Sequence, residues 1–316
     1  MLDALNASRA SKKDSSAGSS AQDPINTASP TAQAPKAPEA SGAEDLLSEH
    51  PVPSPGPEVD PVLNSQQTGQ VDAIVLAGGS GTAIDPDCPI KGLVQVAGRP
   101  LVAWVVSALR AASSIRHIAV VIPRGDNLGE WTELADHIVV HDGSFSENIG
   151  AGAGALAKDL MFLGVTGDIP ALTPEAVDDL VGQTLARKVA VSYPLISEKD
   201  IMEQFPGSSR TFFTLKSGKY TGGNAMVADP RLYGRLHDLT QEMFDTRKSA
   251  FKMLELIGLP FALKLLSGRL DPTDVENKMA HLMNTSCAAI YTHYASIGAD
   301  VDKPADIAPV EQILGR

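Results

Sequence analysis

The chain has 316 residues and carries 26 Lys and Arg against 38 Asp and Glu, a formal charge of −12, and its length suggests one large domain or two small ones. An acidic chain repels phosphate-rich surfaces, so nucleic acid and membrane surfaces are poor general partners and any phosphate chemistry must depend on a local site. The sequence contains no apolar run of the roughly 18 residues that a membrane span needs. Two cysteines cannot build a disulfide framework and the N-terminus has no secretory pattern, so we expect a cytoplasmic protein.

Residues 1–70 differ in composition from the rest of the chain. They contain nine prolines and no aromatic residue, and their four basic and nine acidic residues leave −7 of the formal charge for residues 71–316. Ser, Ala, Pro and Gln dominate, so the segment buries too little apolar surface to offset the entropy of ordering it. We predict a disordered tail over 1–70, a linker or a tether for a partner, followed by one folded domain over 71–316.

From residue 71 onward, short apolar runs alternate with helical patterns. Strands are predicted at 71–77, 117–122, 138–141, 160–165 and 189–193, and helices at 101–112, 146–158 and 174–185. Strands that alternate with helices are typical of an α/β fold with a mostly parallel, twisted sheet and helices on both faces. In that architecture ligands bind at the carboxyl ends of the strands.

The first predicted strand ends in a glycine-rich loop, Leu76-Ala77-Gly78-Gly79-Ser80-Gly81-Thr82. Glycines at this point let the backbone bend sharply and aim several N–H groups at an anion, although a plain tight turn is the alternative. A dinucleotide fingerprint needs a third glycine and an immediate helix, which Pro86 and Pro89 forbid, and a Walker loop needs Gly-Lys-Ser/Thr. What remains is a loop, then an extended stretch with Lys91, then Gly98-Arg99-Pro100-Leu101 opening a helix.

This order of motifs resembles the nucleotidyltransferases of the MobA-like (GT-A type) superfamily, which includes sugar-1-phosphate, molybdenum-cofactor and isoprenoid nucleotidyltransferases. The resemblance implies a Rossmann-like GT-A fold over about 71–316 and an enzyme that transfers a nucleotide. It also implies that one continuous loop and one lysine bind the nucleoside triphosphate, and that the lysine has a catalytic role. These residues are Leu76, Ala77, Gly78, Gly79, Ser80, Gly81, Thr82 and Lys91.

The chain departs from the family pattern at Ala83, where an arginine commonly contacts the triphosphate. A guanidinium makes charge-assisted hydrogen bonds to phosphate that an alanine cannot make. Three interpretations stay open. Either Arg99 or Arg124 substitutes for the missing arginine, or turnover is weak, or the chain is a non-catalytic relative that binds a nucleotide or metabolite and acts through a partner.

Two acidic segments are candidates for a metal site. Asp168 follows the apolar run 160–165, and its resemblance to the family's G-D-x-P element implies that it binds a divalent cation and is catalytic; a turn former or helix cap is the alternative. Asp302, with Asp300 as a second candidate, matches the C-terminal segment that supplies the other ligand in the family. A helix cap is the alternative for Asp302, and Asp306 is expected to be structural. Carboxylates, phosphate and water together suit Mg²⁺ or Mn²⁺.

Candidates for base and acceptor binding come from two further loops. Asn148 belongs to a segment that resembles the family's base-reading loop, and its amide can meet the base or the ribose. Gly223 and Asn224 precede a strand where related enzymes hold the acceptor, although a β-bulge is the alternative. Arg210 is expected on the preceding strand, where it pairs with an acceptor phosphate or forms an exposed salt bridge.

Residues 246–283 are expected to form a helical elaboration of the domain. Their second piece, 259–266, is unusually apolar, which favours packing in the core or against a second copy in a homodimer. Taken together, the residues and the resemblance predict a magnesium-dependent nucleotidyltransferase. It would transfer a nucleoside monophosphate from a triphosphate to a phosphorylated small molecule and release pyrophosphate. The nucleobase and the acceptor are not specified by these motifs.

Overall fold

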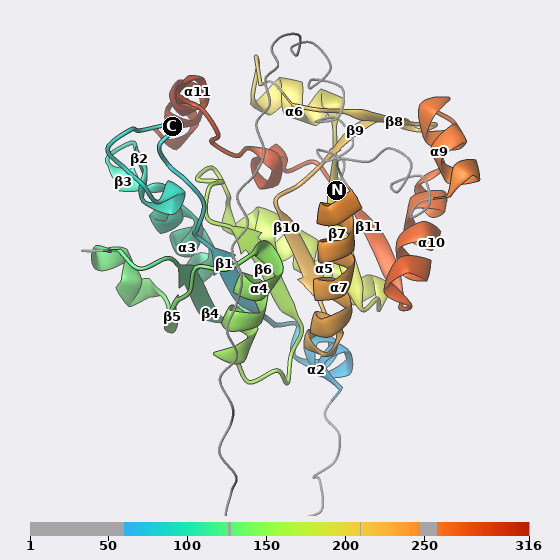
Figure 1. Ribbon diagram of the computed structural model, residues 1–316, viewed down its shortest axis with the longest axis horizontal. Helices are drawn as coiled ribbons and strands as arrows, with labels where there is room; N and C mark the ends of the chain where they lie inside the picture. Colours follow the sequence, from blue (N-terminus) through green and yellow to red (C-terminus); the bar gives the residue numbers. More distant parts are fainter. Residues whose placement is uncertain (1–59, 126–127, 209, 247–257, 316) are drawn as a thin grey trace, which may run out of the picture. The chain divides into compact units, whose positions relative to one another are not determined.

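The computed structural model describes residues 60–125, 128–208, 210–246 and 258–315. Within these ranges nine strands form one sheet in the order β5-β4-β1-β6-β10-β7-β9-β8, with β11 paired to β7 (Figure 1). The strands of this sheet are β1 (Val71–Leu76), β4 (Ile115–Ile122), β5 (His137–Val140), β6 (Phe162–Thr166), β7 (Val191–Ser197), β8 (Phe213–Leu215), β9 (Gly218–Gly222), β10 (Ala225–Ala228) and β11 (Cys287–Thr292). A separate short hairpin joins β2 (Gln95–Val96) to β3 (Arg99–Pro100).

Strand directions place one set of strand ends along a single edge. β1 is parallel to β4 and β6, and β4 is parallel to β5. β10 is antiparallel to both β6 and β7, so β7 runs in the same direction as β6, and β11 is parallel to β7. β9 and β8 extend the sheet with antiparallel pairs. The carboxyl ends of β1, β4, β6, β7 and β11 therefore share one edge, the carboxyl edge, and the predicted mostly parallel sheet is confirmed.

Several helices begin at a residue whose side chain caps them. The α-helices are α2 (Pro61–Thr68), α3 (Leu101–Ala111), α4 (Phe145–Gly154), α5 (Pro174–Arg187), α6 (Glu198–Gln204), α7 (Tyr233–Thr246), α9 (Leu259–Leu266), α10 (Pro272–Met283) and α11 (Ile307–Leu314). Short 3₁₀ helices lie at Lys91–Leu93, Glu130–Leu134, Pro230–Leu232, Ala295–Gly298 and Pro304–Asp306. The Thr173 hydroxyl accepts from the Ala176 amide at 3.2 Å, and Pro174 occupies the first helical position of α5, as the sequence indicates.

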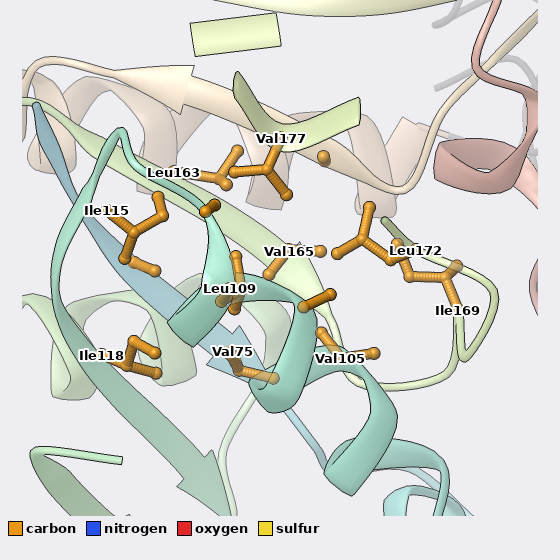
Figure 2. Close-up of a cluster of buried hydrophobic side chains, with 14 of the residues drawn as sticks. Val75, Val105, Leu109, Ile115, Ile118, Leu163, Val165, Ile169, Leu172 and Val177 are labelled. Carbon is orange, nitrogen blue, oxygen red and sulfur yellow. The ribbon is translucent and has the colours of Figure 1, made fainter. Parts of the chain in front are cut away.

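The core lies on both faces of the sheet. Alternate residues of β1 point to opposite faces, so Ala73 and Val75 pack with α3 and α5, whereas Ile74 packs with α4 and α7. Figure 2 shows Val105 and Leu109 of α3 over the β1 and β6 strands. With helices on both faces, the polar loops are left at the strand ends, where a ligand site is expected.

The folded domain begins earlier than the sequence predicts. Pro61–Thr68, which we placed in the tail, forms α2, capped by Asp60 at its start and by Gly69 with φ +71° at its end. Ser65 is fully buried, and its hydroxyl accepts from the Met161 amide at 2.8 Å. The prediction was wrong for these residues because tail-like composition outweighed the local start and stop signals. The rest of the predicted tail, 1–59, lies outside the described residues.

Several element boundaries also differ from the prediction. The helix expected at 146–158 is α4, which ends at Gly154, and the strand expected at 189–193 is β7, which continues to Ser197. Arg210, expected on a strand, lies in the segment before β8. In the expected helical elaboration, α9 and α10 account for 259–266 and 272–283, and residues 247–257 lie outside the described residues. No helix in the described ranges is both long enough and apolar enough to span a membrane.

The opposite edge of the sheet, the amino edge, holds a buried charge network. Asp72 of β1 is 1% exposed and accepts two hydrogen bonds from the Arg116 guanidinium, at 2.9 and 2.7 Å. The same guanidinium donates to both oxygens of Asp159, just before β6, at 2.9 and 2.6 Å. The hydrogen bonds from Arg116 hold the pKa of Asp159 below its ordinary value. One guanidinium therefore satisfies two carboxylates and ties the starts of three strands together.

Candidate active site

The glycine loop leaves β1 at the carboxyl edge and is held open by the segment that follows it. The Lys91 amide donates to the Gly79 carbonyl at 2.9 Å, and the Gly81 amide donates to the Pro89 carbonyl at 3.1 Å. Gly79 has φ +90°, and a Cβ on Gly81 would lie 2.4 Å from the Cys88 carbonyl oxygen. Four N–H groups of the loop find no acceptor within the described ranges: those of Gly78, Gly79, Ser80 and Thr82. These N–H groups are available to hydrogen-bond an anion, as the sequence predicts for this loop.

Lys91 joins this loop to the predicted metal ligands. Its ammonium contacts an Asp168 carboxylate oxygen and lies 2.5 Å from an Asp302 oxygen. The side chains of Lys91 and Asp168 are 15% and 17% exposed, whereas that of Asp302 is 66% exposed. Along the chain, Lys91 lies 77 positions before Asp168 and 211 positions before Asp302. The structure thus brings together the lysine and both first-choice metal ligands that the sequence singled out.

Each carboxylate is oriented by its own surroundings. The Thr166 hydroxyl at the end of β6 donates to Asp168 at 2.5 Å, and the Asp168 carbonyl accepts from the Val301 amide at 3.0 Å. Asp306 accepts from the backbone amides of Asp302 and Lys303, both at 3.0 Å, which fixes the loop that carries Asp302. Asp306 therefore has the structural role expected of it. Thr166 was not singled out from the sequence, although it lies two residues before Asp168.

A third carboxylate, Asp300, completes the cluster. One oxygen each of Asp168, Asp300 and Asp302 lie within 4.8 Å of one another. Asp300 is 23% exposed, and it accepts from the Arg210 guanidinium at 2.5 Å. The structure therefore pairs Arg210 with a protein carboxylate in a largely buried contact. From the sequence, an acceptor phosphate or an exposed salt bridge was expected for this arginine.

The charges of the cluster depend on one another. Burial opposes the charged form of Lys91, but the carboxylates of Asp168 and Asp302 outweigh it and raise the pKa of the lysine above its ordinary value. Burial likewise opposes the charge on Asp302, yet hydrogen bonding to Lys91 lowers its pKa. Burial raises the pKa of Asp300 to about 6, and Arg210 only partly offsets that effect. Asp300 is thus a weaker acid than Asp302.

Gly223 and Asn224 interrupt the strand that pairs with β7. β9 ends at Gly222 and β10 begins at Ala225, and both strands pair with β7. The Asn224 amide donates to the Ile297 carbonyl at 2.9 Å, and its carbonyl accepts from the Thr166 amide at 3.1 Å. A Cβ on Gly223 would lie 2.7 Å from the Ile297 side chain. These bonds tie the segment between β9 and β10 to the end of β6 and to the 3₁₀ helix Ala295–Gly298.

Two buried side-chain donors remain on this side of the cluster. Within the described ranges, neither Arg210 Nε nor Asn224 Nδ2 has a hydrogen-bond acceptor. Arg210 Cζ lies 3.7 Å from the Cβ position of Gly298, the residue that follows the Ile297 partner of Asn224. Buried donors without a protein acceptor point to a bound group with acceptor oxygens.

Asn148 is used within its own loop. Its side-chain oxygen accepts from the Gly143 amide at 3.2 Å and lies 2.8 Å from His141 Nδ1, and its amide donates to the Gly143 carbonyl at 3.0 Å. Ser144 caps α4 in a capping box with Glu147. Asn148 thus shapes the turn between β5 and α4 at the carboxyl edge. Its direct contact with a base stays a prediction.

Of the two arginines considered as substitutes at Ala83, one is already engaged. The Arg99 guanidinium lies 4.5 Å from the centre of the Trp104 ring and donates to the Ser107 hydroxyl at 2.8 Å, so it is held against α3. Arg124 is exposed and follows Pro123, whose ring lies 3.6 Å from the Cβ position of Gly78. Of the two arginines, Arg124 is the one whose chain neighbour lies against the glycine loop.

The donor set of the cluster fits a hard divalent cation. Three carboxylates from two loops converge, and one of them, Asp302, is open to solvent, which leaves room for substrate oxygens and water. Mg²⁺ and Mn²⁺ prefer oxygen ligands of this kind, and Mg²⁺ is usually held by one or two carboxylates together with substrate phosphates. Asp168 and Asp302 would hold the ion, with Asp300 as a further ligand.

At the carboxyl edge of this α/β fold, a glycine loop with available N–H groups lies beside a cluster of carboxylates suited to a cation. The chain belongs to the MobA-like NTP transferase family, whose domain model matches residues 73–255. The family predicted from Leu76–Thr82, Lys91 and Gly98–Leu101 is therefore confirmed.

Individual relatives agree with this family. The chain is 33% identical over 142 residues to a 2-C-methyl-D-erythritol 4-phosphate cytidylyltransferase of Bifidobacterium longum, covering 42% of this chain and 47% of that protein. It is 33% identical over 109 residues to a probable molybdenum cofactor guanylyltransferase of Thermococcus gammatolerans, covering 34% of this chain and 54% of that protein. The matches thus span about half the length of these relatives.

A solved structure extends the similarity over more of the chain. A hypothetical transferase from Thermus thermophilus is 32% identical and superimposes with a TM-score of 0.67. The superposition covers 75% of this chain and 99% of that one. The predicted α/β nucleotidyltransferase fold is confirmed by this likeness and by the sheet order described above.

Proposed function

We propose that the protein is a nucleotidyltransferase that moves a nucleoside monophosphate from a nucleoside triphosphate to a phosphorylated small molecule, with Mg²⁺ or Mn²⁺ as cofactor. The observation that carries this proposal is the convergence of Lys91, Asp168 and Asp302 beside a loop whose N–H groups have no acceptor in the described part of the chain. Membership of the family supports the same reaction class. An anion-binding loop and a cation site at one edge suit a substrate that carries both phosphates and a metal.

In the proposed reaction an oxygen of the acceptor attacks the α-phosphorus of the triphosphate, the bond to the β-phosphate oxygen breaks, and pyrophosphate leaves. The N–H groups around Gly79 hold the phosphates in place, and Lys91 neutralises negative charge on them. When bound, a divalent cation supplies further charge neutralisation on the phosphates. An acceptor that is already a phosphate anion needs no general base, so the protein acts mainly by positioning the two substrates.

The acceptor is proposed to lie beside Arg210, Gly223 and Asn224. Arg210 Nε and Asn224 Nδ2 are buried donors without an acceptor in the described part of the chain, and phosphate oxygens would satisfy both. Their neighbour Asp300 lies within the carboxylate cluster, so an acceptor there would be close to the proposed metal. The nucleobase is proposed to lie toward Asn148, at the turn that precedes α4.

One observation favours a second candidate function. Ala83 occupies the position where the resemblance implies an arginine, and Arg99 is held against α3. A chain that lacks this guanidinium could bind a nucleotide without turning it over and act through a partner. The two candidates differ in one measurable product, which is pyrophosphate.

The test is a pyrophosphate-release assay on the full chain with Mg²⁺. Each of ATP, GTP, CTP and UTP is combined with a panel of acceptors that includes sugar phosphates, polyol phosphates and pterin phosphates. We expect release with one pairing of base and acceptor and none in the Asp168→Ala variant, whose fold is checked by circular dichroism. Nucleotide binding without release across the panel would support the non-catalytic candidate. Full activity in Asp168→Ala would contradict the site assignment.

A further inference from the structure

The charge balance of the cluster is not that of a simple metal site. Three carboxylates, those of Asp168, Asp300 and Asp302, converge within 4.8 Å. Two side-chain cations are paired with them: Lys91 contacts Asp168 and Asp302, and Arg210 contacts Asp300. Each carboxylate that would serve a metal therefore already has a cationic partner from the protein.

Lys91 occupies the gap between the two carboxylates that would hold a divalent cation. Its ammonium bridges Asp168 and Asp302, and its side chain is 15% exposed, so a metal ion cannot bind both carboxylates while the ammonium stays between them. Two cations a few ångströms apart in one partly buried site repel each other. Binding of the metal and the bridging position of Lys91 are thus mutually exclusive.

The lysine has a second destination within its own reach. Its backbone amide is hydrogen-bonded to the Gly79 carbonyl, and its Cβ lies 3.9 Å from the Cβ position of Gly79. The base of the side chain is thus anchored against the glycine loop, which is the proposed triphosphate site. A lysine stem has several rotatable bonds, so the ammonium can turn from the carboxylates to an anion on the loop without any backbone movement.

We propose that Lys91 is the internal counter-ion of the metal ligands, and that a divalent cation displaces it toward the triphosphate. The exchange couples the two ligands: the metal frees the ammonium that the triphosphate needs, and the triphosphate removes the ammonium that competes with the metal. By linkage, each ligand raises the affinity for the other by the same factor. This inference rests on the proposed function, because it takes the metal and triphosphate sites from there.

The exchange is tested with Mn²⁺ alone, by electron paramagnetic resonance titration of the full chain without nucleotide. In Lys91→Met the competitor is gone, so Mn²⁺ should bind roughly tenfold more tightly than in the wild type. Lys91→Arg keeps a cation there and should stay close to the wild type. Lys303→Met is the matched control. Lys303 is an exposed lysine next to Asp302, but Asp168 is paired with Lys91 and not with Lys303.

A second measurement needs no variant. Wild-type protein is labelled with an amine-reactive reagent, with and without Mg²⁺, and the modified lysines are identified by mass spectrometry. Displacement should make Lys91 several-fold more reactive when Mg²⁺ is added, while the reactivity of Lys303 stays unchanged. The measurement remains decisive if Lys91→Met does not fold.

The outcomes separate this inference from the proposed function. Mn²⁺ affinity that is unchanged or weaker in Lys91→Met, or Lys91 reactivity that does not rise with Mg²⁺, would overturn the exchange. If the exchange is overturned but Asp168→Asn abolishes Mn²⁺ binding, the metal site of the proposed function is still supported. If Asp168→Asn leaves Mn²⁺ binding unchanged, the metal site of the proposed function is wrong, and the exchange falls with it.

Discussion

The two edges of the sheet hold charge clusters of opposite design at the two ends of the same strands. At the amino edge, Arg116 donates four hydrogen bonds to Asp72 and Asp159, so one cation satisfies two carboxylates with fork geometry. At the carboxyl edge, Lys91 offers a single ammonium to Asp168 and Asp302, and Asp300 lies close by. The first cluster is locked by a guanidinium, whereas the second is held by an ammonium that another cation can displace.

The choice of cation explains the difference. A guanidinium is planar and always charged, so it locks two carboxylates into one arrangement. An ammonium on a flexible stem neutralises charge without fixing geometry, and it can be exchanged for another cation. We therefore assign the amino edge to stability and the carboxyl edge to binding and chemistry. The following predictions separate these two roles.

The largest effect is expected at the carboxyl edge. Asp168→Asn removes a proposed metal ligand and leaves Lys91 with one carboxylate fewer, so turnover should fall by roughly 10³-fold or more. The matched variant is Asp159→Asn, which changes the carboxylate at the other end of β6 and should leave turnover almost unchanged. Initial rates of pyrophosphate release measure both. Equal losses in the two variants would contradict the division of roles.

Arg116→Met should be the most destabilising single change at the amino edge. It leaves Asp72, whose side chain is 2% exposed, charged and without its guanidinium partner. Breaking a buried pair from one side costs about 3–5 kcal/mol, and replacing both partners costs less. Urea unfolding should therefore show a smaller loss in the double variant Asp72→Asn/Arg116→Met. Mn²⁺ binding by folded Arg116→Met should match the wild type.

Gly81→Ala should disturb the glycine loop at moderate cost. The added Cβ would lie 2.4 Å from the Cys88 carbonyl, so the loop must shift, with a loss of about 1–3 kcal/mol and weaker triphosphate binding. Gly182→Ala is the control, because that helical position in α5 has open space around it and should gain about 0.5–1 kcal/mol. Thermal unfolding measures the stability of both variants, and nucleotide titration measures their affinity for the triphosphate. Wild-type stability and wild-type triphosphate affinity in Gly81→Ala would contradict the close packing of Gly81 against Cys88.

The smallest effect is the acid sensitivity of the amino edge. Hydrogen bonds from Arg116 hold the pKa of Asp159 below the ordinary value of 3.8. The stabilisation is present above that value and is lost as the pH falls through the lowered pKa. Asp159→Asn should therefore flatten the decline of the urea midpoint between neutral and acidic pH. An equally steep decline in the variant would show that other groups cause it.

Local patterns in the sequence predicted much of the site. The glycine loop, Lys91 and Asp168 lie in short segments whose residue order is itself the signal, and the structure gathers them at one edge. Their pairing was not predictable, because Lys91 meets its two partners across 77 and 211 residues of chain. The contact between Arg210 and Asp300 spans 90 residues and was missed for the same reason.

Structural features outside the motifs were harder to predict. Arg116 reaches Asp72 and Asp159 across more than 40 residues, and no local pattern reports such a contact. The helix α2 does have local signals, an aspartate cap, Pro61 at its first position and Gly69 after its end. They were overlooked because the composition of 1–70 was averaged over the whole segment.

The most direct test of the central claim is a thermal-shift measurement on the full chain with each of ATP, GTP, CTP and UTP, with and without Mg²⁺. A ligand at a hundred times its dissociation constant stabilises the folded state by about 2.7 kcal/mol, which is visible as a rise in Tm. We predict that one triphosphate raises Tm, that the rise requires Mg²⁺, and that it is lost in Asp168→Ala. The account would be contradicted if no triphosphate raised Tm, or if Asp168→Ala responded like the wild type.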